Sequence, residues 1–248
     1  MTKHSQTLRD KVILITGASS GIGEAIAREL AAAGAQVVAG ARRLDRLQKL
    51  QAEVEAGGGR LQVQTLDVTS HAQVDTFARL AQQAYGRVDA IINNAGLMPL
   101  SPLAALKIDE WNQMIDVNIR GVLHGIAAVL PIMNTQGHGH VVNVASIGAH
   151  RVSPTAAVYC ATKYAVWAIS DGLRQETDRI RVTTISPGVV SSELADTISD
   201  ESARSAMRDF RSVAIEPDAI ARAVRFAIEQ PADVDVSEMI VRPTASPH

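Results

Sequence analysis

The chain has almost no cysteine: Cys160 is the only one among its 248 residues. Since no disulfide can form within the chain, we expect a cytoplasmic protein, and Cys160 itself is predicted to be a small packing residue. The first ten residues are polar and lack the apolar core of a signal peptide. No uncharged apolar run reaches the roughly 18 residues of a membrane span, so no membrane partner is expected.

An excess of charge of either sign is also missing. The 24 lysine and arginine residues nearly balance 26 acidic residues, which gives a formal net charge of -2. No basic stripe is long enough to follow a phosphate backbone, so nucleic acid is not an expected partner. His138 and His140 lie close together, but no carboxylate or cysteine cluster accompanies them, and we predict no metal site.

Apolar runs alternate with amphipathic stretches along most of the chain, of which 46% is hydrophobic. Strands are predicted at residues 12–15, 36–41, 60–66, 88–92, 140–145, 181–186 and 237–241, and helices at 25–33, 43–56, 71–85, 109–133, 157–178 and 217–229. This order predicts an α/β fold: a Rossmann-like, doubly wound parallel sheet of about seven strands, forming one domain over residues 1–248. The polar stretch 189–212 breaks the alternation and is predicted to be a mobile flap over a site.

A glycine-rich turn follows the first predicted strand. It contains Gly17, Ser19, Ser20, Gly21, Ile22 and Gly23. Here a bare backbone with exposed N–H groups, at the start of a helix, can approach a pyrophosphate. The spacing Gly-x-x-x-Gly-x-Gly differs from the general dinucleotide fingerprint. The alternative is a turn that only joins strand to helix, but three glycines with two serines favour a dinucleotide site.

Two arginines follow the second predicted strand, at the position that selects between dinucleotides. An acidic residue there would accept a hydrogen bond from the ribose 2′-hydroxyl of NAD, but Ala41 occupies it and Arg42 and Arg43 come next. Guanidinium groups bind a phosphate in a bidentate manner. We therefore predict NADP(H) rather than NAD(H), with the alternative that one arginine is simply solvated.

Tyr159 and Lys163 are four residues apart on a predicted helix and so share one face. The spacing predicts that the ammonium, jointly with a cationic nicotinamide ring, lowers the pKa of the phenol, making Tyr159 a proton donor and acceptor for hydride-transfer chemistry. Ser146, thirteen residues earlier, is a candidate hydrogen-bond donor to a substrate oxygen. Each residue alone has a structural alternative, such as packing, solvation or a cap, and their joint spacing favours catalysis.

In their order along the chain these motifs resemble the short-chain dehydrogenase/reductase family in its form of roughly 250 residues. The resemblance implies that Asp67 and Val68 contact the adenine ring, and that Asn94, Ala95 and Gly96 wall the adenosine ribose. It also implies that Lys163 holds the nicotinamide ribose. Asn118 would help to hold a water linking Lys163 to solvent, through its side chain or a local bulge. Pro187, Gly188 and Val190 would border the nicotinamide, and Ser192 stands where many relatives have threonine.

The resemblance implies an NADP(H)-dependent oxidoreductase acting on the CH–OH group or carbonyl of a small substrate. Short matching stretches point toward dehydrogenases of serine, 3-hydroxy acids and clavulanate-type aldehydes. His150, Arg151 and Arg211 near the expected pocket would favour a carboxylate, whereas Leu97, Met98 and Val152 suit an apolar ketone or aldehyde, and the sequence leaves this choice open.

Two further expectations concern partners and rival functions. Helices 109–133 and 157–178 carry apolar residues on more than one face, which predicts a homotetramer, with a dimer as the alternative. Trp111 and Trp167 on these helices are predicted to be core or subunit-contact residues. The rival function is a non-catalytic, NADP-binding redox sensor of the same fold. A lyase or epimerase is disfavoured by the short C-terminal region.

Overall fold

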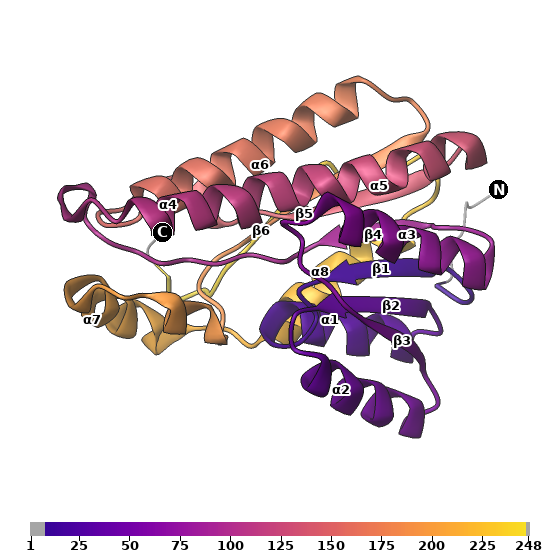
Figure 1. Ribbon diagram of the computed structural model, residues 1–248, viewed down its shortest axis with the longest axis horizontal. Coiled ribbons are helices and arrows are strands. Elements are labelled where there is room, and N and C mark those ends of the chain that lie inside the picture. The colour runs from indigo at the N-terminus through magenta and orange to yellow at the C-terminus, as the bar shows by residue number, and fades with distance from the viewer. Residues whose placement is uncertain (1–7, 247–248) are drawn as a thin grey trace.

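The computed structural model of the protein describes residues 8–246 and is built on one parallel sheet (Figure 1). Its strands are β1 (Val12–Thr16), β2 (Gln36–Ala41), β3 (Arg60–Thr65), β4 (Ala90–Asn93), β5 (Gly139–Val144), β6 (Ile180–Pro187) and β7 (Glu238–Val241). Their order in the sheet is β3-β2-β1-β4-β5-β6-β7. The predicted seven-stranded, doubly wound Rossmann-like architecture is confirmed, and most of its strands are buried because they are apolar on both faces.

Helices cover both faces of the sheet. The helices of the structure are α1 (Gly21–Ala32), α2 (Leu44–Ala56), α3 (His71–Tyr85), α4 (Ile108–Met114), α5 (Gly121–Gln136), α6 (Ala157–Gln175), α7 (Glu201–Phe210) and α8 (Pro217–Glu229), of which all but α4 and α7 pack on the sheet. One core cluster joins the sheet to α1, α2 and α8, and a second joins it to α3, α5 and α6. The strand order reverses direction between β1 and β4, which places a crevice for ligands at the carboxyl ends of these strands.

Two helices differ from the sequence-based prediction. Helix α1 begins at Gly21 rather than at residue 25, because the end of the glycine turn forms the first turn of the helix. The predicted helix 109–133 is three segments: α4, a π-helix over Ile115–Arg120, and α5. A π-helix widens the turn by one residue and frees backbone groups from the α-helical ladder, a change that hydrophobic periodicity does not reveal.

The stretch Ile108–Gln136 is also long and apolar enough, by these two criteria, to cross a membrane. This is weak evidence, because the core helix of a soluble protein passes the same test. Here Val122, Ile126, Val129 and Met133 pack in the second core cluster. Packing against the sheet therefore accounts for much of the apolar character of this stretch.

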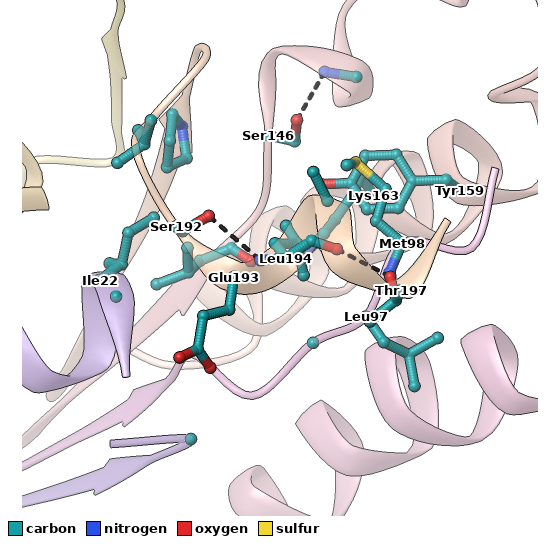
Figure 2. Close-up of a pocket in the computed structure, with 18 of the residues that line it drawn as sticks. Ile22, Leu97, Met98, Ser146, Tyr159, Lys163, Ser192, Glu193, Leu194 and Thr197 are labelled. Carbon is teal, nitrogen blue, oxygen red and sulfur yellow. Dashed lines mark hydrogen bonds between the residues drawn. The ribbon is translucent and has the colours of Figure 1, made fainter. Parts of the chain in front are cut away.

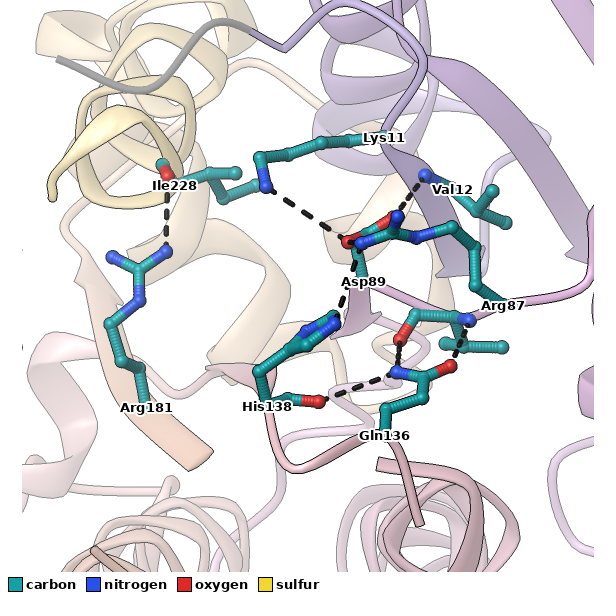
Figure 3. A network of polar contacts seen from close by, with 9 residues as sticks. Lys11, Val12, Arg87, Asp89, Gln136, His138, Arg181 and Ile228 are labelled. Atoms are coloured by element: carbon teal, nitrogen blue, oxygen red, sulfur yellow. Dashed lines mark hydrogen bonds and ion pairs between the residues drawn. The ribbon is translucent and has the colours of Figure 1, made fainter. Parts of the chain in front are cut away.

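A buried carboxylate organises the amino ends of the strands (Figure 3). The Asp89 carboxylate accepts a hydrogen bond from Val12 N at 2.9 Å and pairs with Arg87 and with Lys11. Nearby, Arg181 donates to the carbonyl oxygens of Ala227 and Ile228 at 2.9 and 3.0 Å, which satisfies the last turn of α8. This end of the sheet is closed by mutually paired groups.

The segment 189–212, expected to be a flap, folds back across the carboxyl ends of the strands. It contains a 3-10 turn at Glu193–Thr197 and helix α7, and Asp200 caps α7 by accepting from Ala203 N at 2.9 Å. In α7 only Ala203 is fully buried. The flap thus lies over the crevice with little of its own core.

Candidate active site

A cavity of about 1540 Å³ lies at the carboxyl ends of the strands. It extends from the glycine turn after β1, past the loops that follow β2 to β6, to the inner side of the flap. Its volume exceeds the range typical of a site for one small ligand, so a dinucleotide and a substrate can share it.

The glycine turn has two backbone positions that favour glycine. Gly17 and Gly21 have φ values of +69° and +55°, which side chains other than glycine rarely adopt. A Cβ added at Gly17 would lie 2.8 Å from Ala95 Cα, so the turn is pressed against the loop after β4. Asn94 secures this contact by donating to Thr16 O and Gly17 O at 3.0 and 3.2 Å. Ile22 and Gly23 continue into α1 and present its N-terminus to the cavity.

Arg43 spans the gap between this turn and the flap. Its guanidinium group donates to Ser19 Oγ at 3.3 Å, to Ser20 Oγ at 2.8 Å and to the Glu193 carboxylate at 2.8 Å. Arg46 pairs with the same carboxylate. Hydrogen bonds from Arg46 and Arg43 lower the pKa of Glu193 to about 2. Arg42 is exposed and lines the same end of the cavity.

Sequence reasoning missed Arg46 and the role of Glu193. Arg46 lies in the first turn of α2, three residues after Arg43, which directly precedes the helix, and this short spacing was a signal that both side chains can reach one group. No spacing could have revealed Glu193, because it is 150 residues from Arg43 and meets it only through the folding of the flap.

The predicted adenine side of the cavity lies after β3. The Asp67 carboxylate accepts from Thr69 N and Thr69 Oγ1 at 2.9 and 2.8 Å, which fixes the turn that it begins. Val68 is buried and packs against Gly121. A Cβ added at Gly121 would lie only 2.8 Å from the side chain of Val68. Both Asp67 and Val68 line the cavity.

Asn118 sits in the π-helix, 1% exposed, and its side chain is fully engaged. Its amide donates to Leu97 O and Thr162 Oγ1 at 3.0 and 3.1 Å, and its Oδ1 accepts from Leu97 N at 2.9 Å. Of the two ways in which Asn118 was expected to hold a water, the local bulge therefore fits better than the side chain. A Cβ added at Gly96 would lie 3.3 Å from Asn118 Oδ1 and 3.7 Å from Lys163 Nζ. The loop after β4, the π-helix and α6 therefore pack closely at this point.

Ser146, Tyr159 and Lys163 come together on the inner wall of the cavity (Figure 2). Ser146 follows β5 and caps the turn after it by accepting from Gly148 N at 3.0 Å. Tyr159 and Lys163 lie on α6 and are only 8% and 5% exposed. The Lys163 ammonium donates to Val144 O at 2.9 Å and lies 5.9 Å from the centre of the Tyr159 ring.

The protein groups alone shift the pKa of Tyr159 in the direction opposite to the one predicted for Lys163 and a nicotinamide together. Burial raises the pKa of the phenol to about 12, and a hydrogen bond with Ser146 only partly opposes this. Burial also lowers the pKa of Lys163 to about 8. The physical reason is that desolvation acts on both groups, while the ammonium is directed at a backbone carbonyl rather than at the phenol oxygen.

The loop after β6 brings the flap against the glycine turn. Pro187 ends β6, and Gly188 N donates to Val241 O at 2.7 Å. Val190 forms a bridge with Ile215, and Ser192 caps the next turn by accepting from Leu194 N at 3.4 Å. A Cβ added at Gly21 would lie 3.2 Å from Ser192 Cβ, so the flap begins directly above the expected pyrophosphate site.

The substrate side of the cavity is largely apolar. Met98 packs with Tyr159 in a buried cluster, against which Leu97, Leu194 and Met207 are placed. Arg211 donates to Ser192 O at 2.6 Å, so it braces the flap. His150 Nε2 lies 2.9 Å from Ser186 Oγ and 3.1 Å from Glu238 Oε1. Arg151 also lines the cavity, whereas Val152 is exposed and is not among the residues that line it.

The remaining residues singled out in the sequence have structural surroundings. His140 is buried beside Thr183, and His138 lies near Arg87. No group of three or more potential metal-ligating side chains gathers anywhere within residues 8–246. Cys160 is buried next to Tyr159, where burial raises the pKa of its thiol. Trp111 is half-buried beside the substrate-side cluster, and Trp167 is 39% exposed.

Comparison with known proteins identifies the protein family. The sequence model of the short chain dehydrogenases matches residues 11–203, which is most of the chain. The chain belongs to the short-chain dehydrogenase/reductase family. As a member of this family it is an oxidoreductase.

Relatives agree over nearly the whole length. An uncharacterized oxidoreductase of Staphylococcus saprophyticus is 52% identical over 242 residues, covering 96% of this chain and 98% of the relative. The closed form of a serine dehydrogenase complexed with NADP+ superposes with a TM-score of 0.88 at 31% identity, covering 96% of each chain. A short-chain dehydrogenase/reductase from Burkholderia phymatum in complex with NAD gives 0.85 at 26% identity, covering 94% of this chain and 89% of that one. Structural neighbours thus bind nicotinamide cofactors of both types.

Proposed function

We propose that the protein is an NADP(H)-dependent oxidoreductase that interconverts a carbonyl and an alcohol on a small substrate. The observation that supports this most is the convergence of Ser146, Tyr159 and Lys163 on one cavity that also includes the glycine turn and Arg43. One sheet would carry both the cofactor site and the substrate site over residues 1–248, with 189–212 as a mobile substrate flap.

The chain fits the dinucleotide. The positive-φ glycines and the N-terminus of α1 would receive the pyrophosphate, Asp67 and Val68 the adenine, and Asn94, Ala95 and Gly96 the adenosine ribose. Arg42 and Arg43 would bind the 2′-phosphate. Pro187, Gly188, Val190 and Ser192 would border the nicotinamide. The bound nicotinamide supplies the hydride and, when oxidised, a positive charge near the active-site residues.

The residues of the chain would handle the proton. Ser146 Oγ hydrogen-bonds the substrate oxygen and orients the carbonyl, while the Tyr159 hydroxyl donates its proton to the developing alkoxide. A pKa of about 12 keeps this phenol protonated at neutral pH, the form that carbonyl reduction requires. Lys163 stabilises charge beside the phenol and would hold the ribose hydroxyls. Asn118 would link Lys163 to solvent through a water held at the π-helix.

The substrate class follows from the cavity wall. Leu97, Met98, Leu194 and Met207 surround the space beside Tyr159, and Arg211 is directed at a flap carbonyl. We infer an apolar ketone or aldehyde rather than a carboxylate. Because one structural neighbour is a serine dehydrogenase, serine and 3-hydroxy acids are included among the substrates to be tested.

Steady-state kinetics test this proposal. NADPH oxidation is measured with aldehydes, ketones, quinones and keto acids, and the reverse reaction with serine and 3-hydroxy acids, each with both cofactors. We expect turnover with NADPH and an apolar carbonyl. Equal or better catalytic efficiency with NADH would end the NADP assignment. The absence of any turnover, with NADPH bound, would favour the redox-sensor alternative.

A homotetramer remains our proposal for the assembly. The first of two apolar surfaces that support it contains Leu123 of α5 and Tyr164 and Trp167 of α6, and the second contains Phe226 of α8 and Ile240 of β7, each 52% exposed. Two separate self-associating surfaces give a tetramer of dihedral symmetry. In light scattering we expect that Trp167→Glu and Phe226→Glu each halve the mass. A wild-type species of only 26.4 kDa would refute the proposal.

A further inference from the structure

Glu193 is the one flap residue whose carboxylate joins two arginines of the cofactor site. One carboxylate oxygen accepts from Arg43 Nη1 at 2.8 Å, and the other pairs with Arg46. The side chain is directed away from Tyr159 and Lys163 (Figure 2). It therefore faces the end of the cavity where the loop after β2 selects the dinucleotide, and not the reacting centre.

The same guanidinium group is shared with the glycine turn. Arg43 also donates to the hydroxyls of Ser19 and Ser20, so its position is set at the rim of the expected phosphate site. A phosphate on the adenosine 2′-oxygen would need these donors, and Glu193 already places one carboxylate oxygen on Arg43 and the other on Arg46, as an anion bridging the two guanidinium groups. Because its pKa is lowered to about 2, Glu193 is an anion at every physiological pH.

We propose that Glu193 is a cofactor-selectivity residue that occupies the arginine pair in place of the 2′-phosphate, so that a 2′-phosphorylated nucleotide must displace it. The inference rests on the proposed NADP(H) function. Displacement frees the first turn of the flap from α2, so the phosphate that identifies the cofactor also loosens the segment above the substrate. A nucleotide without this phosphate leaves the tether in place.

Calorimetric titration with two probes tests this inference without turnover. The probes are adenosine 2′,5′-bisphosphate and AMP, which differ only in the 2′-phosphate. In Glu193→Gln we expect the bisphosphate to bind about fivefold to tenfold more tightly than in wild type, and AMP to bind within twofold of wild type. The matched control is Glu201→Gln, which removes a carboxylate of the same flap that pairs with Arg204. It should change neither affinity.

The outcomes separate the two proposals. If wild type binds both probes equally, the NADP(H) assignment fails. If wild type prefers the bisphosphate but Glu193→Gln shifts neither probe, or both equally, only the role of Glu193 fails. Trypsin cleavage after Arg208 in α7 gives a second measurement. Bisphosphate but not AMP should speed cleavage of wild type, while Glu193→Gln should be cut faster without nucleotide. If neither the bisphosphate nor the Glu193→Gln substitution changes the cleavage rate, the proposed coupling between the phosphate and the flap is wrong.

Discussion

Asp89 and Lys163 are both buried charged groups at opposite ends of the sheet, and they are treated differently. At the amino ends, Asp89 has a backbone donor and two cationic partners. At the carboxyl ends, Lys163 has the single acceptor Val144 O among the described residues, and burial lowers its pKa to about 8. A charge with all its partners stabilises the fold, whereas a charge left with spare donors is available for a ligand.

The largest expected effect tests the reactive end. Tyr159→Phe removes the proposed proton donor with little change in packing volume, so we expect turnover to fall about a thousandfold. Calorimetry should show NADPH binding unchanged, and circular dichroism an intact fold. Turnover within a few-fold of wild type would show that another group is the acid.

Lys163→Met should break activity but not the fold. We expect kcat/KM to fall several hundredfold and NADPH to bind more weakly, because both the charge and the ribose donor are lost. The lowering of the Lys163 pKa from 10.5 to about 8 corresponds to about 3 kcal/mol of unfavourable burial of the charged form. The melting temperature of the variant at pH 7 should therefore equal or exceed that of wild type.

The pH dependence of the unfolding free energy provides a control for this variant. Since the pKa is lower in the folded state, the unfolded chain binds more protons between about pH 8 and 10.5, and wild-type stability gains over that range. Any excess of the melting temperature of Lys163→Met over that of wild type should therefore shrink as the pH rises from about 8 to 10.5. A variant strongly destabilised at pH 7 would contradict our account of this end.

Asp89→Ala should show the opposite pattern. The variant leaves Val12 N and Lys11 without their acceptor, so we expect a loss of about 3 kcal/mol in the free energy of unfolding by urea. The kcat/KM of the protein that remains folded should stay within twofold of wild type. A specific loss of catalysis would mean that the two ends are coupled.

The pH dependence of the two directions sharpens the assignment of roles. Reduction should be flat from about pH 6 to 7.5 because Tyr159 stays protonated, and should fall above about pH 8 as Lys163 loses its proton. Oxidation needs the phenolate, so its kcat/KM should rise up to about tenfold per pH unit over the flat range. A reductive rate that rises with pH would exclude the phenol as donor.

The smallest effect concerns selectivity. Arg43→Ala should raise the KM for NADPH about tenfold while that for NADH changes by less than threefold. Arg42→Ala, measured in parallel, separates the exposed arginine from the one held by Ser19 and Ser20. Equal effects on both cofactors would assign Arg43 to general support of the turn.

What the sequence could predict depended on short-range signals. Apolar runs and glycine positions were enough for the sheet and the phosphate turn, and the four-residue spacing was enough to put Tyr159 and Lys163 on one face. The burial of the Tyr159 side chain could not be predicted from the residues near it in the sequence. The pKa of Tyr159 therefore moves in the direction opposite to the prediction, since desolvation depends on what the whole fold packs around the phenol. The π-helix and the contact of Glu193 with α2 were equally invisible to periodicity.

The wide turn at Ile115–Arg120 also constrains how this chain can change in length. It contains one residue more than regular α-helical winding would use there. Deleting a single amino acid from it would restore regular winding and leave α4 and α5 in nearly the same relative orientation, because the extra residue is absorbed within this one wide turn. Trp111 and Met114 would then keep their places beside the substrate space, and the change would be confined to the turn that contains Asn118. Shortening by one residue at this position would thus spare the wall of the substrate space, but would return to the α-helical ladder the backbone groups that the π-helix frees.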